Sequence, residues 1–179
     1  MTETADDLLP LTWTHAIHDV SARGLDIKRA ADTSELEALT SALEVLSVDS
    51  FEAAYRVTAQ SGQRYRLSGS FRANVSQACV VTLEPITSQI VEEFSVGFCP
   101  PENADKATDD EKSVLNEPDV EILTNSTLEI GRILYELLVA ALDPYPRKAD
   151  AEFTYRDPLL ASAAPPSPFA ALSKLKNDG

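Results

Sequence analysis

Two neighbouring segments, residues 50–60 and 64–75, alternate apolar and polar side chains. Alternation with a period of two is typical of a β-strand that buries one face. Residues 61–63, Ser-Gly-Gln, separate the segments and predict a three-residue turn. Such a turn keeps both apolar sets on the same face of a β-hairpin. The apolar positions are Phe51, Ala53, Tyr55, Val57, Tyr65, Leu67, Phe71, Ala73 and Val75.

The opposite face of this hairpin is predicted to be cationic, although the chain carries a net charge of −14. Between residues 53 and 83 there is no Asp or Glu, and the four arginines give a local charge of +4. One hypothesis is that this face contacts RNA, whose affinity for proteins depends on lysine and arginine. The alternative is a solvated face paired with Glu52, Glu92 or Glu93. The four arginines are Arg56, Arg64, Arg66 and Arg72.

Three further segments favour strands. Residues 86–98 carry inward candidates at Ile90, Phe94, Val96 and Phe98, and residues 11–17 and 24–31 are shorter candidates. Gly69 lies on the apolar side of the hairpin and indicates a bulge or a close packing contact. The predicted sheet is mostly antiparallel.

Two helices are predicted from their capping residues. Ser34 with Glu37 has the spacing of a capping box before a leucine stripe, which predicts a helix over residues 34–46. Ser126 with Glu129 repeats that spacing before a broad apolar stripe that ends at Asp143 and Pro144. The second helix is expected to cover the sheet.

These elements predict an α+β fold in which two helices cover the sheet. The sheet is either flat or curled into a half-barrel. Residues 1–156 are expected to form one domain with an exposed acidic loop at residues 100–121, which has a net charge of −6. Residues 157–179 are expected to be a flexible tail. Its short terminal motif, with Phe169, Leu172 and Leu175, either docks on its own domain or binds a partner.

The sequence motifs predict no enzyme, no cofactor and no metal site. The chain lacks the glycine-rich phosphate loop, the G-x-S-x-G elbow and the H-E-x-x-H motif. Cys79 and Cys99 have no second cysteine nearby, so buried packing roles are expected for both. His15 and His18 are expected to face solvent. A weaker alternative is a metalloprotein or redox protein that uses the two cysteines.

The sequence predicts neither export nor a membrane span. The longest apolar run, residues 137–142, has six residues, far short of the roughly 20 that span a bilayer. The start of the chain is acidic, where a secretory signal would be basic. We therefore expect a cytoplasmic protein with no small-molecule substrate.

The order of several motifs resembles the YceD family of bacterial and plastid large-ribosomal-RNA accumulation proteins. Cys79, Leu83, Glu84 and Pro85 follow the hairpin, an acidic loop and a leucine-rich helix come next, and the sequence PFAALSKLK begins at residue 168. The resemblance covers the chain from about residue 10 to its end. The family's fuller pattern is Cys-x-x-Cys-Leu-x-Pro, and Thr82 stands where the second cysteine would be. This difference favours packing over chemistry for Cys79. Pro85 is expected to end the strand and start the next turn.

The resemblance implies a factor needed for the accumulation of large-subunit ribosomal RNA, without a known catalytic site. Because the family's genes commonly neighbour that of a small basic ribosomal protein, it also suggests a basic partner. The leading hypothesis is a noncatalytic ribosome-biogenesis factor that binds ribosomal RNA, a basic ribosomal protein, or both. The alternative is an acidic adaptor that binds only protein, either an RNA-processing enzyme or a ribosomal protein. The oligomeric state stays open.

Overall fold

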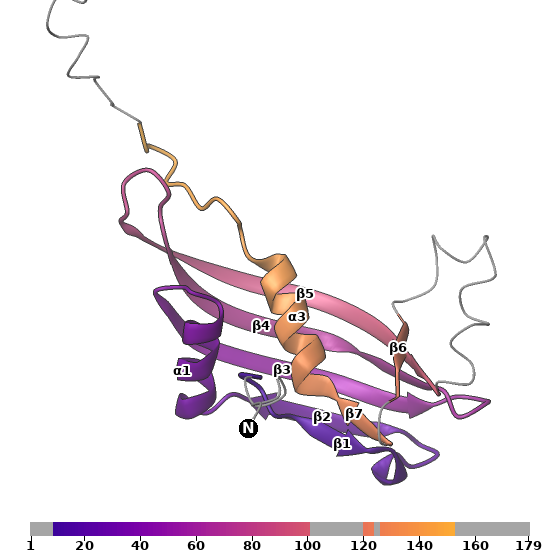
Figure 1. The fold of residues 1–179 in the computed structure, drawn as a ribbon. Helices are drawn as coiled ribbons and strands as arrows, with labels where there is room; N and C mark the ends of the chain where they lie inside the picture. Colours follow the sequence, from indigo (N-terminus) through magenta and orange to yellow (C-terminus); the bar gives the residue numbers. More distant parts are fainter. Residues whose placement is uncertain (1–8, 101–119, 124–125, 153–179) are drawn as a thin grey trace, which may run out of the picture. The chain divides into compact units, whose positions relative to one another are not determined.

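The computed structural model describes residues 9–100, 120–123 and 126–152. The chain divides into two compact units, Met1–Lys148 and Ala149–Gly179, and the helices and strands of the described residues all belong to the first. Its main element is a five-stranded sheet in the order β2-β3-β4-β5-β6 (Figure 1). The strands are β2 (Leu25–Ala30), β3 (Ser47–Ala59), β4 (Tyr65–Ala78), β5 (Pro85–Cys99) and β6 (Val120–Ile122).

The predicted hairpin is formed by β3 and β4. Val57 lies opposite Leu67 and Phe51 lies opposite Ala73, so both apolar sets share one face. The backbone N–H of Gln60 donates to the carbonyl oxygen of Arg64 at 2.7 Å, which closes the predicted three-residue turn. Its Gly62 has a φ of 74°, a conformation that glycine adopts without steric cost. The alternation therefore predicted both the pairing and the face.

The sheet is mostly antiparallel and curled, as the sequence allowed, and it is not closed into a barrel. β2, β3, β4 and β5 pair antiparallel, whereas β6 pairs parallel with the end of β5. The last residues of the predicted acidic loop, residues 120–121, belong to β6, so the loop boundary was wrong there. Residues 101–119 lie outside the described residues.

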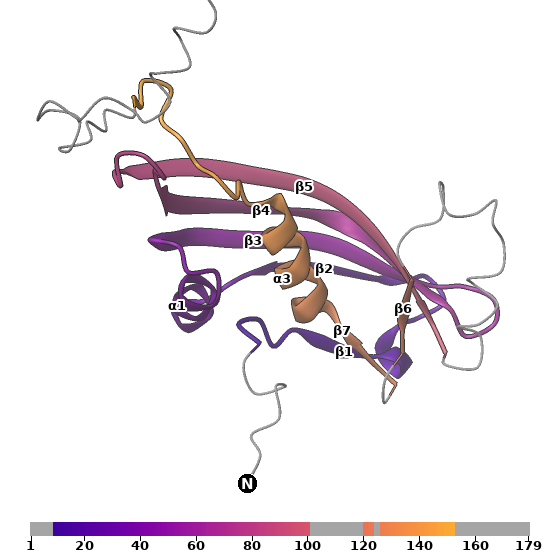
Figure 2. The ribbon, with the colours of Figure 1, turned by 45° about the horizontal axis from the view of Figure 1, so that its top comes forward.

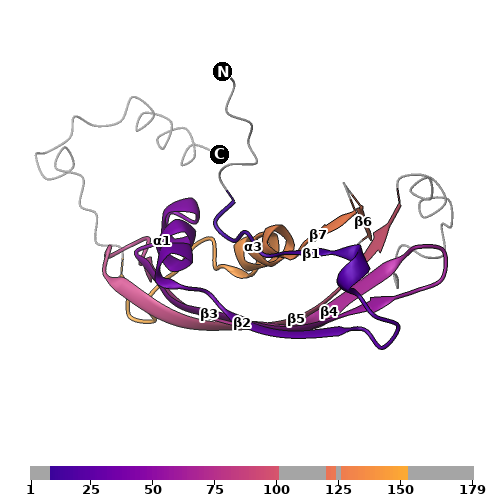
Figure 3. The same cartoon turned by 90° about the horizontal axis from the view of Figure 1, so that it is seen from below.

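Two α-helices lie on the concave face of the sheet, so the predicted α+β class is confirmed (Figures 2 and 3). α1 (Thr33–Ala42) begins at Asp32, whose side chain accepts from the backbone of Glu35 in a capping box. The predicted box of Ser34 and Glu37 is therefore shifted by two residues. Leu46 lies beyond the helix and is 53% exposed, so its predicted place in the buried stripe was wrong.

The second helix starts later than its sequence predicts. α3 (Ile130–Ala141) has no side-chain cap, and Ser126 with Glu129 forms no capping box. β7 (Thr127–Glu129) instead pairs with β1 (Thr14–Ala16) in a separate two-stranded sheet. Strand pairing with a distant segment overrides the local capping signal here. Of the segment 11–17 that was expected to be a strand, only Thr14–Ala16 is one, and a short 3-10 helix (Ile17–Asp19) begins at its last residue.

The core lies between the concave face of the sheet and the two helices. It includes the hairpin residues Phe51 and Phe71, whose rings stack at 5.5 Å, together with Leu134 and Leu138 of α3. Phe94, Val96 and Phe98 of β5 are buried as predicted, and Ile90 packs against the same cluster. Both helices lie on the concave side of the sheet (Figure 3). Because side chains alternate between the two faces of a strand, the polar residues of the hairpin are left on the convex face.

Gly69 allows β3 and β4 to approach closely. A Cβ atom at this position would lie 2.6 Å from the Cα of Tyr55, its cross-strand partner. The irregular register that marks a bulge lies elsewhere, between Val48 and Ser50. Of the two interpretations of Gly69, close packing is therefore the one that the structure supports.

Candidate functional site

The convex face of the sheet carries a cation in each of four consecutive rows of cross-strand neighbours. Because the inward and outward positions alternate, adjacent rows are two residues apart along a strand, about 7 Å. The four rows therefore extend about 20 Å along β4. From one end of the sheet to the other, the rows are Thr58-Arg66-Gly97, Asp26-Arg56-Ser68-Ser95, Lys28-Ala54-Ser70-Glu93 and Ala30-Glu52-Arg72-Val91.

Three of the four predicted arginines share this face, and the fourth lies at its edge. Arg56, Arg66 and Arg72 are all exposed at outward positions, whereas Arg64 is exposed in the turn just before β4. Lys28 of β2 completes the series, and sequence reasoning missed it. The alternation within residues 24–31 could have indicated its face, but its row depends on the pairing of β2 with β3.

The cations differ in how strongly they are already engaged. Arg56 forms a salt bridge with Asp26 at 3.0 Å and also donates to the carbonyl oxygen of Arg23. The alternative hypothesis expected pairing with Glu52, Glu92 or Glu93, but Arg56 forms a salt bridge with none of these three residues. Among the described residues, Lys28, Arg66 and Arg72 form no salt bridge. These three charges remain available to a ligand.

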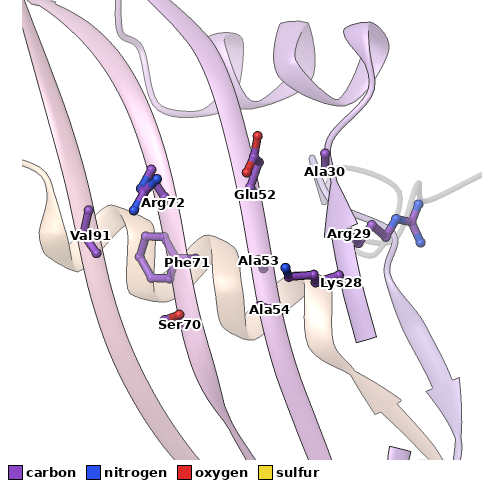
Figure 4. A pocket seen from close by; sticks show the side chains of 10 residues that line it. All are labelled: Lys28, Arg29, Ala30, Glu52, Ala53, Ala54, Ser70, Phe71, Arg72 and Val91. Carbon is purple, nitrogen blue, oxygen red and sulfur yellow. The ribbon is translucent and has the colours of Figure 1, made fainter. Parts of the chain in front are cut away.

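A shallow hollow lies between these cations. Lys28 lies at one end of the row that holds the small side chains Ala54 and Ser70, and Arg72 lies one row further along β4, next to Glu52 (Figure 4). A second hollow continues past Ser68 toward Arg56. Small residues in the middle of the face let a ligand backbone approach the sheet, and the serine hydroxyls can donate or accept hydrogen bonds.

The outward positions of the described strands β2–β5 carry no aromatic residue. Sheets that read single-stranded RNA by its bases commonly stack them on aromatic side chains. This face has no such aromatic platform, and its cations and serine hydroxyls are suited to phosphates and sugar hydroxyls.

The family-motif residues form the turn that joins β4 to β5. The backbone N–H of Cys79 donates to the carbonyl oxygen of Glu84 at 2.8 Å, and that of Leu83 donates back to Cys79 at 2.9 Å. Leu83 has a φ of 61° and is 77% exposed. Pro85 is the first residue of β5, opposite Ala78, so the expectation that it ends the preceding strand was wrong. The first position of a strand tolerates proline because it needs no ladder donor.

Cys79 is buried, as predicted, but its thiol is unusually acidic. The side chain of Thr82 and the backbone N–H groups of Lys148 and Thr82 hydrogen-bond to the sulfur. These bonds favour the thiolate and lower the pKa of Cys79 to about 6. Thr82, at the position of the family's second cysteine, therefore acts as a hydrogen-bond donor in this turn.

The other candidate ligands do not assemble into a site. Cys99 is a free, buried cysteine, and the described residues contain no group of three or more side chains that could hold a metal. His18 is exposed, but His15 is half-buried and hydrogen-bonded to the hydroxyl of Tyr55 at 2.8 Å, so its expected exposure was wrong. Burial lowers the pKa of His15. Phe169, Leu172 and Leu175 lie outside the described residues.

The chain is thus an α+β protein with an open, curled sheet. Helices cover the concave face of this sheet, and the convex face carries a cation in each of four consecutive rows. A family model described as large ribosomal RNA subunit accumulation protein YceD matches residues 67–176. This match covers more than half of the chain, which therefore belongs to the YceD family. It includes Arg72 and the Cys79 turn, whereas Lys28, Arg56, Arg64 and Arg66 precede it. No curated protein and no solved structure matches the chain. No helix within the described ranges has the length and apolar character of a membrane span.

Proposed function

We propose that this protein is a noncatalytic cytoplasmic factor for the accumulation of large-subunit ribosomal RNA, and that it binds this RNA through the convex face of the sheet. The family name supports a role in ribosomal RNA accumulation. The observation that carries the RNA contact is the cation in each of four consecutive rows, three of them without a salt bridge among the described residues. The step between rows is comparable to the distance between successive phosphates of an extended strand.

In this proposal the RNA is held by its backbone. Lys28, Arg66 and Arg72 contact phosphates, and Ser68 and Ser70 contact phosphate or 2′-hydroxyl oxygens between them. Because contacts to phosphates and sugars carry no sequence information, binding is independent of base sequence. The convex curvature favours an RNA surface that is itself concave or flexible enough to follow the sheet.

A salt titration tests the RNA contact. Fluorescence anisotropy with large-subunit RNA fragments compares the natural chain with a triple variant, Lys28→Gln, Arg66→Gln and Arg72→Gln. If each residue neutralises one phosphate, the slope of log affinity against log salt falls by about 2 for a single strand. Arg147→Gln removes one exposed charge from outside the sheet and should barely change the slope. An unchanged affinity and slope in the triple variant would exclude this face.

One observation favours the alternative function, an adaptor that binds only protein. On the four rows, Asp26, Glu52 and Glu93 offset three of the four cations, so the net charge of the face is small. Partner capture with and without nuclease separates the two functions. An RNA-binding factor loses its ribosomal partners when RNA is digested, whereas an adaptor keeps them.

A further inference from the structure

A second surface, on the concave side of the sheet, has the opposite electrostatic character. A groove lies between α1 and the start of β3. Half-buried Leu36 and Val45, together with buried Val48, make its apolar floor. The exposed acids Glu37 and Glu44 line its rim, and no Lys or Arg lines it. α1, which forms one wall of the groove, is about 15 Å long, because its ten residues rise 1.5 Å each.

The walls of this groove are held by specific contacts. The hydroxyl of Thr40 donates to the carbonyl oxygen of Leu36 and accepts from the backbone N–H of Val48, both at 2.9 Å. On the other flank of α1, Glu35 accepts from the indole of Trp13 at 2.7 Å and pairs with Arg29 at 3.1 Å. The helix is therefore anchored on both sides, and the groove does not depend on a loose segment.

The two rim acids are free to meet a cation. Among the described residues, neither Glu37 nor Glu44 forms a salt bridge, and the one ion pair on α1 is that of Glu35. Acids on a rim lead incoming ligands of positive charge toward the groove and oppose negative ones. The apolar floor requires that the same ligand also carry apolar side chains.

Glu44 lies just after the C-terminus of α1, at a position where a glutamate destabilises the helix. It follows Leu43, the C-cap of α1, with a φ of 53°, and its N–H and that of Val45 bond back to Ser41 and Thr40. This arrangement closes helices with glycine in most cases, because a Cβ is strained there. A carboxylate also faces the negative end of the helix dipole, where a cation would be favoured. An acid at this position loses stability on both counts, which indicates that it serves another purpose.

We propose that the groove between α1 and β3 is a docking site for a basic amphipathic segment of a partner protein. Apolar side chains of the segment sit on Leu36, Val45 and Val48, and its lysines or arginines pair with Glu37 and Glu44. Charge complementarity selects this occupant: the two charged residues of the rim are both acids, so an acidic segment or a nucleic acid would be repelled. The site lies on the other side of the sheet from the cationic rows and does not depend on RNA binding there.

The test uses the full chain and two labelled synthetic peptides with the same leucine spacing, one with lysine and one with glutamate at the polar positions. Fluorescence anisotropy should show binding of the leucine–lysine peptide, weaker at high salt, and none of the leucine–glutamate peptide. Replacing both rim acids (Glu37→Gln and Glu44→Gln) should reduce the affinity about fivefold, as expected for two exposed ion pairs. Equal binding of the two peptides, or no change in the double variant, would overturn the proposal.

A second variant distinguishes a functional from a structural role of Glu44. Glu44→Gly should raise the unfolding midpoint by about 2–4 °C, through relief of strain and of the dipole clash, while it weakens binding of the leucine–lysine peptide. Gln63→Gly is the matched control, because Gln63 is exposed and has a φ of 58° in the distant hairpin turn. It should raise the midpoint without changing peptide affinity. Unchanged affinity in Glu44→Gly would contradict the proposal, as would a dimer of this chain that the rim substitutions dissociate.

Discussion

The ammonium group of Lys148 lies 2.7 Å from the carboxylate of Glu84, and this ion pair joins the segment after α3 to the β4–β5 turn. The same segment accepts a backbone hydrogen bond at the carbonyl of Pro146 from Val80, at 2.9 Å. Two parts of the chain that are more than 60 residues apart are thereby held together at one end of the sheet. The family-motif turn is stabilised from outside its own sequence.

Replacing Glu84 with glutamine should lower stability at neutral pH but not at acid pH. Lys148 and its hydrogen bond lower the pKa of Glu84. A carboxyl group whose pKa is lower in the folded than in the unfolded protein stabilises the fold at pH values above the unfolded pKa. This stabilisation is lost as the pH falls through the folded pKa. Denaturant unfolding of both chains at neutral pH and near pH 3 checks this expectation. Glu93→Gln, at an outward position without a salt bridge among the described residues, is the control. A difference between the Glu84 chains that does not vary with pH would contradict the prediction.

The thiol of Cys79 should titrate near pH 6, because hydrogen bonds from Thr82 and Lys148 lower its pKa to about 6. Absorbance of the thiolate in the ultraviolet follows the titration, and Cys79→Ser should remove this step. Thr82→Val should shift the step upward, because it deletes the side-chain donor. The stability due to this ionisation should be lost as pH falls through about 6. A step that Thr82→Val leaves in place would show that the hydrogen bond is not its cause.

Substituting Gly69 with alanine should destabilise the sheet by about 1–3 kcal/mol or more, since overpacking forces backbone movement. The new Cβ would lie 2.6 Å from the Cα of Tyr55, and that atom cannot move without disturbing the β3–β4 pairing. Thermal or denaturant unfolding measures the loss. Ser70→Ala, the next residue and on the outer face, should be nearly neutral. Equal stability of the two variants would mean that the strands adjust more easily than their contacts indicate.

Removing the side chain of Arg132 should cost about 1 kcal/mol or more, because one guanidinium joins three carboxylates. Its nitrogens lie 2.7 Å from Glu121, 3.2 Å from Glu129 and 2.8 Å from Glu136, so it connects β6 and β7 to α3. Chemical denaturation of Arg132→Ala gives the size of the effect. Arg132→Lys keeps the charge but loses the planar, forked guanidinium group. Its stability should therefore lie between those of the natural chain and Arg132→Ala. No loss of stability in the alanine variant would show that the network is only a surface arrangement.

The paired strands at the centre of the fold were predictable because their signal is local. Alternation in residues 50–60 and 64–75, with a three-residue turn between them, implies the pairing of Val57 with Leu67. It also implies that Arg56, Arg66 and Arg72 face away from the core. Any other face would bury guanidinium groups without partners, which is energetically excluded.

The first residues of the helices were less predictable from the sequence. Pairing or hydrogen bonding with residues far away in the chain competes there with the local capping signal. Ser126 and Glu129 have a capping-box spacing, but Thr127–Glu129 gains a strand partner in Thr14–Ala16 and the helix begins only at Ile130. At α1 two overlapping boxes were available, and the box of Asp32 and Glu35 forms, with Glu35 also bonded to Trp13 and Arg29.

Periodicity within the chain was enough to assign the hairpin, the buried set and the outward arginines, because each depends on the steric alternation of neighbouring residues. Three other features required the folded chain: the place of Lys28 in the cationic series, the capture of Arg56 by Asp26, and the groove in which Glu37 and Glu44 stand above Leu36. Each depends on how separate elements are placed against one another. That placement results from packing and pairing over long sequence distances, which no short window of residues records.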